Sequence, residues 1–124
     1  MLTTARYGTR DLERARGFYD AIAEIIGARR VMDHENMTAY RGAAGGMFII
    51  GKPYAGEQTI GNGAQIGFDA PSRAAVDAVH AKALELGGTC EGAPGPRGPA
   101  EMNFYAAYFR DLDGNKLIVT HVGG

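Results

Sequence analysis

The sequence predicts an α+β fold in which a βαβββ module occurs as two tandem copies. Two amphipathic helical stretches lie about sixty residues apart, and each has one short strand-like segment before it and three after it. With 124 residues, 45% of them hydrophobic, the chain is long enough for one domain, residues 1–124, with its own core. A four-stranded sheet covered by one helix leaves a face open, so the modules must pair, with either a shared core or a lined cleft between concave faces.

The first module is expected to span about residues 1–57. Its strand-like segments are Thr3 to Thr9, Arg29 to Asp33, Thr38 to Arg41 and Met47 to Ile50. Apolar residues at helical spacing predict a helix between the first two strands, with Asp11 as its N-cap and Gly27 as its C′ stop. The buried stripe of this helix is Leu12, Ala15, Phe18, Tyr19, Ile22, Ile25 and Ile26.

A glycine-rich linker, about residues 55–64, leads to the second module, about residues 62–124. Its strand-like segments are Gln65 to Phe68, Thr89 to Glu91, Phe104 to Phe109 and Lys116 to His121. A helix is predicted from Pro71-Ser72 to Gly87-Gly88. The Gly/Pro-rich segment from Gly92 to Asn103 is expected to be irregular.

The stretch FRDLDGNKLIVTH, Phe109 to His121, is either a cation loop or a tight turn. Counted from Asp111, the twelfth residue is Val122 rather than the bidentate Glu that a calcium loop requires. Glycine and asparagine supply the positive φ of a two-residue hairpin turn, so we expect one at Asp113-Gly114 or Gly114-Asn115.

Charge and cysteine content exclude several classes of partner. The 13 basic and 14 acidic residues leave no electrostatic footprint for nucleic acid or an anionic membrane. The single Cys90 excludes an internal disulfide, and with no His close in sequence we expect a small buried hydrophobe. No stretch approaches the length of a membrane span, and the first residues lack an apolar signal segment. A cytoplasmic location is expected.

Two motifs at opposite ends of the chain resemble the vicinal oxygen chelate superfamily: DLERARGFYDAI, from Asp11 to Ile22, and RDLDGNKLIV, from Arg110 to Val119. The superfamily includes glyoxalase I, extradiol dioxygenases, fosfomycin-modifying enzymes and bleomycin-binding proteins. The resemblance covers nearly the whole chain. It implies the glyoxalase/bleomycin resistance/dioxygenase fold, in which curved mixed sheets enclose a central cavity. It also implies a homodimer, in some relatives with modules exchanged between subunits.

The positions that hold metal ligands in metal-using relatives carry other residues here. Thr4 stands where the first strand usually has His, Gln65 where the second module opens with His, and Ile118 where the last strand has Glu. The fourth position falls in MFIIG, whose candidates are the apolar Phe48, Ile49 and Ile50. Because such side chains are poor or impossible metal ligands, we expect no metal site and no cofactor. A divalent metal bound by unusual residues is the alternative.

Several polar residues are candidates for binding a ligand instead. Thr4 and Arg6 share one face of the first strand, and polar groups on an inward face suit ligand or water better than a dry core. An edge placement would leave Arg6 in solvent. The complete set of cavity candidates is Thr4, Arg6, Gln65, Arg97, Asn103, Tyr105, Tyr108 and Ile118. Tyr105 and Tyr108 differ in strand parity, so at most one of them faces the cavity.

These observations predict a glyoxalase/bleomycin-resistance-like protein that lacks the usual metal ligands and binds a small organic molecule in its cavity. Two other functions stay open. One is a lyase or oxidoreductase of glyoxalase or dioxygenase type, with an atypical metal site or with acid–base chemistry by Arg97, Glu101 or a tyrosine. The other is a catalytically inert structural subunit. Ligand identity and enzymatic activity are left open by the sequence.

Overall fold

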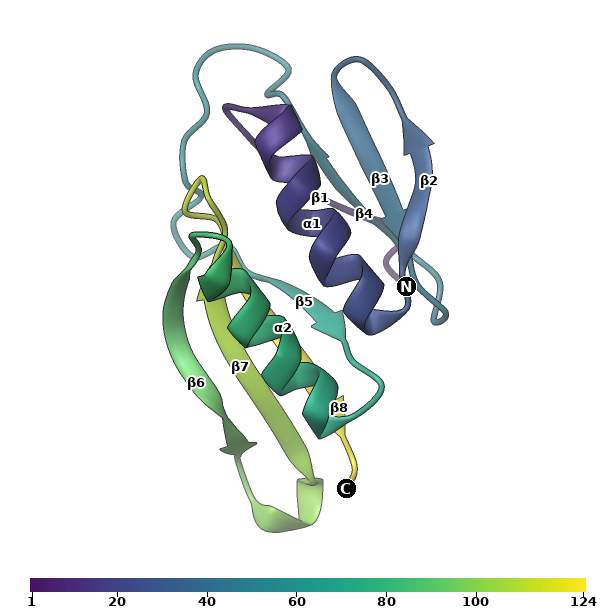
Figure 1. Cartoon of the computed structure of the whole chain (residues 1–124), viewed down its shortest axis with the longest axis vertical. Coiled ribbons are helices and arrows are strands. Elements are labelled where there is room, and N and C mark those ends of the chain that lie inside the picture. Colours follow the sequence, from purple (N-terminus) through teal and green to yellow (C-terminus); the bar gives the residue numbers. More distant parts are fainter.

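Two four-stranded sheets, each covered on one face by a helix, make up the computed structural model, which describes residues 1–124 (Figure 1). The first sheet has the order β1-β4-β3-β2 and the second β5-β8-β7-β6. In each sheet the first strand of the module runs parallel to the last, and the other pairs are antiparallel. The repeated βαβββ module is therefore confirmed. The strands are β1 (Thr4–Gly8), β2 (Arg29–Asp33), β3 (Met37–Arg41), β4 (Met47–Gly51), β5 (Ile66–Asp69), β6 (Thr89–Arg97), β7 (Phe104–Arg110) and β8 (Lys116–Val122).

The helices α1 (Leu12–Ile26) and α2 (Arg73–Glu85) begin at the caps that the sequence predicts. The Asp11 side chain accepts a hydrogen bond from the backbone N–H of Arg14 at 3.1 Å. Ser72 Oγ accepts one from the N–H of Ala75 at 3.0 Å. Gly27 ends α1 in the left-handed region, with φ of 78°.

Strand β6 corrects one expectation, because it continues to Arg97 through the segment that we expected to be irregular. The register with β7 shifts between Cys90 and Gly92 and again between Gly92 and Gly95. Bulges of this kind absorb residues that do not fit a regular ladder. Because β6 is an edge strand, paired only with β7, its prolines also leave few ladder bonds unmade.

The connection between β7 and β8 is a turn, as predicted, but it is not a two-residue hairpin. Arg110 pairs with Lys116, so five residues, Asp111–Asn115, lie between the strands. Gly114 alone among them has positive φ, at 92°. Asp111 Oδ1 accepts the backbone N–H groups of Asp113 and Asn115, each at 2.9 Å, which replaces the ladder bonds a tighter hairpin would make.

This turn joins the second module to the first. Asp113 Oδ2 accepts a hydrogen bond from Thr9 Oγ1 at 2.5 Å, and Asn115 Nδ2 donates to the carbonyl of Gly8 at 2.9 Å. Beside it, α1 packs against α2, and the Phe18 and Phe109 rings lie 6.3 Å apart. One hydrophobic cluster of 19 buried residues spans both modules. A shared core therefore joins the two modules.

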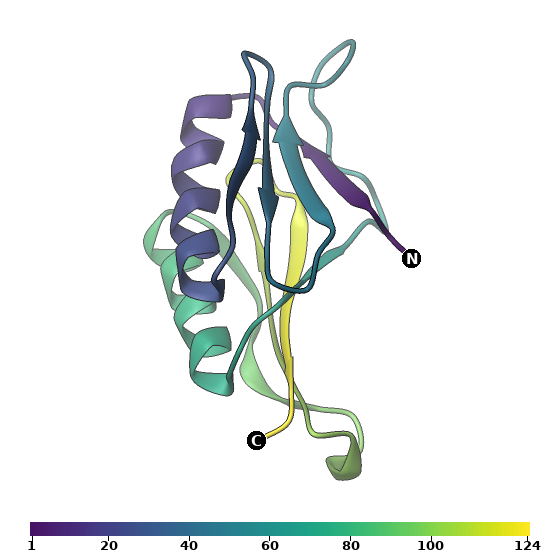
Figure 2. The same cartoon turned by 90° about the vertical axis from the view of Figure 1, so that its right-hand side faces the viewer.

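Both helices lie on one side of the molecule and both sheets on the other (Figure 2). The faces of the two sheets that no helix covers therefore point to the same side. We call these the open faces. Neither α1 nor α2 has the length and hydropathy that a membrane-spanning helix requires.

Candidate functional site

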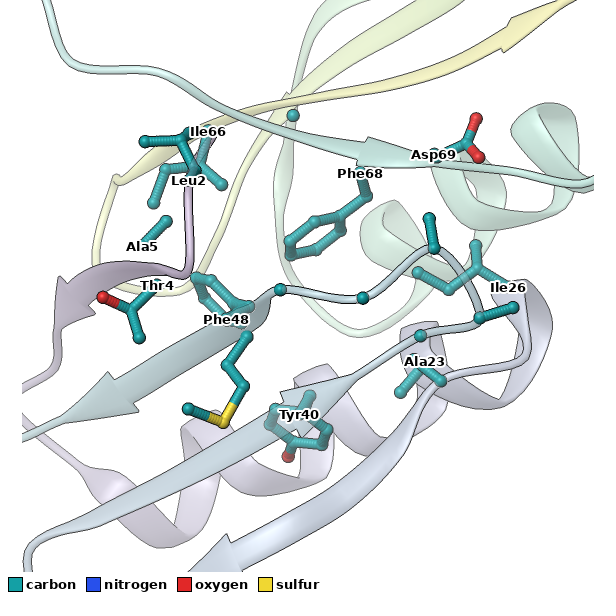
Figure 3. A pocket seen from close by; sticks show the side chains of 18 of the residues that line it. Leu2, Thr4, Ala5, Ala23, Ile26, Tyr40, Phe48, Ile66, Phe68 and Asp69 are labelled. Atoms are coloured by element: carbon teal, nitrogen blue, oxygen red, sulfur yellow. The ribbon is translucent and has the colours of Figure 1, made fainter.

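A cavity of about 360 Å³ lies between the two modules (Figure 3). Its walls come from the outer edges of β1 and β5, the C-terminal half of α1, and the loop 42–46 that joins β3 to β4. Fourteen of its 22 lining residues are hydrophobic. Segments distant in sequence thus form one largely apolar space, which is the usual character of a small-molecule site.

Four aromatic side chains line this cavity and form its aromatic wall: Tyr19, Tyr40, Phe48 and Phe68. The ring of Phe48 lies 5.0 Å from that of Phe68 and 4.7 Å from that of Tyr19, centroid to centroid. Spacings in this range are favourable for aromatic pairs, so the rings of this wall stabilise one another.

The two tyrosine hydroxyls in this wall bond to groups outside the cavity. Tyr19 Oη donates to Asp111 Oδ2 at 2.6 Å, and Tyr40 Oη donates to Asp20 Oδ1 at 2.6 Å. Burial, followed by the neighbouring carboxylate, raises the pKa of both hydroxyls, so they remain protonated donors. Because each hydroxyl already has its acceptor, the rings offer mainly carbon surface to a ligand.

The loop 42–46 forms the wall opposite β5, and it consists of two alanines and three glycines. Gly45 and Gly46 have φ of 85° and 72°, a conformation that side chains rarely adopt. With no side chain larger than a methyl group, this wall leaves open the space that bulkier residues would fill.

Of the eight predicted ligand-binding residues, Thr4 alone lines the cavity. Arg6 lies on the open face of the first sheet, where its Nη2 donates to the carbonyl of Lys52 at 2.8 Å. Gln65 is exposed just before β5. These three residues therefore do not line this cavity together: β-strand alternation turns Thr4 and Arg6 to the open face, and Thr4 reaches the cavity from the edge strand.

Three other predicted residues do come together, on the open face of the second sheet. Tyr108 of β7 and Ile118 of β8 are register partners, and the Arg97 guanidinium lies 5.7 Å from the Tyr108 ring centroid. Lys116, which the sequence identifies only as the start of a strand, has its Nζ 5.5 Å from the same ring.

Tyr105 and Asn103 lie apart from this group. Tyr105 faces α2, where its hydroxyl donates to Asp77 Oδ1 at 2.7 Å, and this hydrogen bond raises the pKa of the hydroxyl. Asn103 occupies the left-handed region, with φ of 50°, in the turn before β7. The parity argument is confirmed, because Tyr108 faces the open side and Tyr105 the helix.

The positions of the family metal ligands do not form a metal site in this chain. Ile49 and Ile118 lie on the open faces and offer no donor atom, and Thr4 and Gln65 are poor ligands. No group of three or more His, Cys, Asp or Glu side chains is placed to hold a metal ion. The residues present therefore do not fit a divalent metal.

One titratable pair is not apparent from the sequence. His80 Nε2 lies 3.2 Å from Cys90 Sγ, although the residues are ten apart and belong to α2 and β6. Cys90 is exposed rather than buried as expected, because β6 is an edge strand. His80 is 8% exposed, and burial lowers its pKa, so it is neutral near pH 7. Only the pairing of helix and strand in space could reveal this contact.

Comparison with known proteins agrees with the fold. The family model described as Glyoxalase/Bleomycin resistance protein/Dioxygenase superfamily matches residues 2–119. A solved glyoxalase/bleomycin resistance protein from Albidiferax ferrireducens T118 is similar over 99% of both chains, with 38% identity and a TM-score of 0.88. No protein with a curated functional description matched the chain.

More distant structures share the fold. A glyoxalase/bleomycin resistance protein/dioxygenase family enzyme from Burkholderia phytofirmans PsJN is 16% identical, with a TM-score of 0.73 and 98% of both chains covered. A lactoylglutathione lyase from Agrobacterium tumefaciens is 20% identical, with a TM-score of 0.67 over 98% of this chain and 92% of that one.

Proposed function

We propose a ligand-binding function for this chain, which belongs to the glyoxalase/bleomycin resistance protein/dioxygenase superfamily. The ligand is a small, uncharged and largely apolar organic molecule that occupies the cavity between the modules. The observation that carries this proposal is a cavity of about 360 Å³ whose aromatic wall includes two tyrosines with hydroxyls already bonded elsewhere. A preformed apolar space favours a molecule whose ring can pack against this wall.

The same observation separates this function from an inert structural subunit. If the chain served only as packing, its own side chains should fill the space between the modules, because protein interiors are close-packed. Instead, methyl groups and glycines of the loop 42–46 leave the space open. Glu101, a predicted acid or base, lies exposed in the short 3₁₀ helix Ala100–Met102, so the enzymatic alternative gains no support from it.

Thermal-shift and titration measurements with indole and toluene test the proposal. A ligand that binds the native state alone adds about 2.7 kcal/mol to the free energy of unfolding at a hundredfold excess over its Kd. We expect both probes to raise the melting temperature, and Ala23→Leu to abolish this rise, because Ala23 is a buried residue of the cavity wall.

The matched control is Ala74→Leu, the same substitution at an exposed position of α2. It should leave the response to indole unchanged. The proposal fails if neither probe raises the melting temperature of the native chain, or if both variants respond to the probes as the native chain does.

We further propose that the protein is a homodimer. β1 and β5 each have a neighbour on one side only, and unpaired strand edges invite pairing with another chain. Apolar side chains accompany these edges: Leu2 is 76% exposed, and Ile66 and Phe68 are half-buried. In a twofold dimer both chains contribute the same surface patch, here the edges of β1 and β5, and each chain covers the edges of the other.

Light scattering coupled to size exclusion tests the dimer. We expect twice the chain mass of 13.1 kDa at micromolar concentration. Leu2→Glu should shift the equilibrium toward monomer because it places a charge at the apolar edge. Tyr54→Glu, at a fully exposed loop position, should not. A native chain that is monomeric throughout contradicts the proposal.

A further inference from the structure

Two cationic side chains flank one aromatic ring on the open face of the second sheet. Tyr108 lies on β7, the strand between β6 and β8, and its ring is half-buried. The Arg97 guanidinium from β6 is 5.7 Å from the ring centroid, and Lys116 Nζ from β8 is 5.5 Å from it. Both distances are within the range of cation–π attraction, so the ring holds two positive charges near each other.

Arg97 is held in place by the backbone of its own strand. Its Nη2 donates to the carbonyl of Ala93 at 2.5 Å and its Nη1 to that of Pro96 at 3.2 Å. A guanidinium has five N–H donors, so three remain for another partner. The side chain therefore presents a fixed fork and loses little conformational entropy when it binds.

Two glycines of β6 make room for this arrangement. A Cβ atom at Gly95 would lie 3.1 Å from Arg97 Nη1, and one at Gly92 would lie 3.0 Å from Tyr108 Cδ1 and 3.4 Å from Arg97 Nη2. Contacts this close force the neighbour to move. The glycines of this segment thus leave room for the guanidinium beside the Tyr108 ring.

The positive charges of this group are not neutralised within the chain. Neither Arg97 nor Lys116 forms an ion pair. The nearby carboxylate, Glu91, pairs with Arg110, and the hydrogen bond from Arg110 is the main cause of its lowered pKa, with the charges of Arg110 and Lys116 adding to it. Arg110 and Lys116 therefore share this carboxylate, and no carboxylate pairs with Arg97.

We propose that Arg97, Lys116 and Tyr108 form a binding site for a small organic acid, a molecule with a carboxylate or phosphate group on a planar apolar body. The free donors of Arg97 match the paired oxygens of such a group, and the Lys116 ammonium adds a point charge. The planar body packs on Tyr108 and on Ile118, its register partner. This site is separate from the cavity between the modules, because none of these four residues lines that cavity.

Binding of benzoate and phenyl phosphate, followed by NMR titration of the whole chain, tests this site. Benzamide is the neutral counterpart of benzoate, and inorganic phosphate lacks the planar body. We expect benzoate, phenyl phosphate or both to bind at millimolar concentration. Benzamide should bind at least about tenfold more weakly than benzoate, and inorganic phosphate at least about tenfold more weakly than phenyl phosphate. Which oxyanion binds more tightly distinguishes a carboxylate ligand from a phosphate ester.

Substitutions locate the binding. Arg97→Gln and Lys116→Gln should each weaken binding about tenfold because each removes a charge-assisted contact. Gly95→Ala should weaken it with little change in melting temperature, because the added methyl group displaces only the end of the Arg97 side chain. Arg14→Gln, at an exposed position of α1, is the matched control and should bind as the native chain does.

The site is refuted if neither acid binds, or if benzamide binds as tightly as benzoate. It is equally refuted if both Gln variants at Arg97 and Lys116 bind like the native chain, or if inorganic phosphate binds as tightly as phenyl phosphate. Indole binding in the cavity should be unchanged in the Arg97→Gln variant, so failure of this site is distinguishable from failure of the cavity.

Discussion

The hydroxyl of Tyr19 in α1 donates a hydrogen bond of 2.6 Å to the Asp111 carboxylate in the β7–β8 turn, and both residues are almost fully buried. One bond thus ties the helix of the first module to the turn of the second. Tyr19→Phe removes the donor and leaves Asp111 Oδ2 with Asn115 Nδ2 as its partner. We expect this change to lower the free energy of unfolding by about 1–3 kcal/mol, measured by urea denaturation.

Tyr54→Phe provides the matched control for this experiment. Tyr54 is fully exposed in the linker region, so removal of its hydroxyl should leave the unfolding free energy within about 0.5 kcal/mol of the native value. Equal stability of the two variants would show that the bond between the modules contributes nothing.

We expect the same substitution to have opposite effects on stability at two glycines, one inside α1 and one at its C-terminal cap. Gly17 is exposed inside α1, and a Cβ atom there would meet nothing within 4 Å. Gly17→Ala should therefore stabilise the protein by about 0.5–1 kcal/mol, since alanine is the better helix former. Gly27 has equal space but a φ of 78°, so Gly27→Ala should destabilise by about 1 kcal/mol. Thermal unfolding of both variants measures whether each is more or less stable than the native chain. A change in the same direction for both would contradict this explanation.

The helices and the repeated module were predictable because their signals are local. Caps such as Asp11 and Ser72 and the apolar stripes follow from spacing within one helical turn or a few. Strand β6 was underestimated because bulges and edge position, which let prolines enter a sheet, depend on a neighbouring strand that the local sequence does not identify.

The candidate sites were predicted only in part, because both are assembled from distant segments. Strand parity correctly separated Tyr105 from Tyr108, since alternation is a property of one strand. The contribution of Lys116, and the aromatic wall around Phe48, depend on which strands lie side by side and on how the modules pack. The four positions that hold metal ligands in metal-using relatives indicate that those ligands are absent here, but they do not indicate where the apolar cavity lies.

Asn115 in the β7–β8 turn is a position where we expect a negative charge to destabilise the fold. It is 2% exposed, and its Nδ2 donates to the carbonyl of Gly8 and to Asp111 Oδ2, each at 2.9 Å. Asn115→Asp would place a carboxylate oxygen against two acceptors. We expect the unfolding free energy at pH 7 to fall by several kcal/mol, because a buried charge without a partner is costly.

The pH dependence of this variant has a definite sign. Burial and the Asp111 charge would raise the pKa of the new carboxyl above its unfolded value, so the folded state binds the proton more tightly. Acidification toward pH 5 should therefore reduce the stability difference between Asn115→Asp and the native chain. Asn36→Asp, at an exposed position, should show no such convergence. Urea denaturation at two pH values checks both statements.

The last prediction concerns His80, whose Nε2 lies 3.2 Å from Cys90 Sγ. Burial lowers the pKa of His80 below the unfolded value of about 6.5, and the charge of Asp77 opposes this only in part. The unfolded chain therefore takes up a proton more readily than the folded one. Stability from this residue is fully present above about pH 6.5 and is lost as pH falls through the folded pKa.

His80→Gln removes this titration while retaining a polar side chain near the thiol. We expect the free energy of unfolding of this variant to depend less on pH between about 7.5 and 5 than that of the native chain. His34→Gln, at an exposed turn position, should retain the native dependence. Urea denaturation at several pH values in this window measures the slopes. If His80→Gln keeps the native slope, His80 is charged as easily in the folded chain as in the unfolded one, and its burial under β6 has no energetic consequence for protonation.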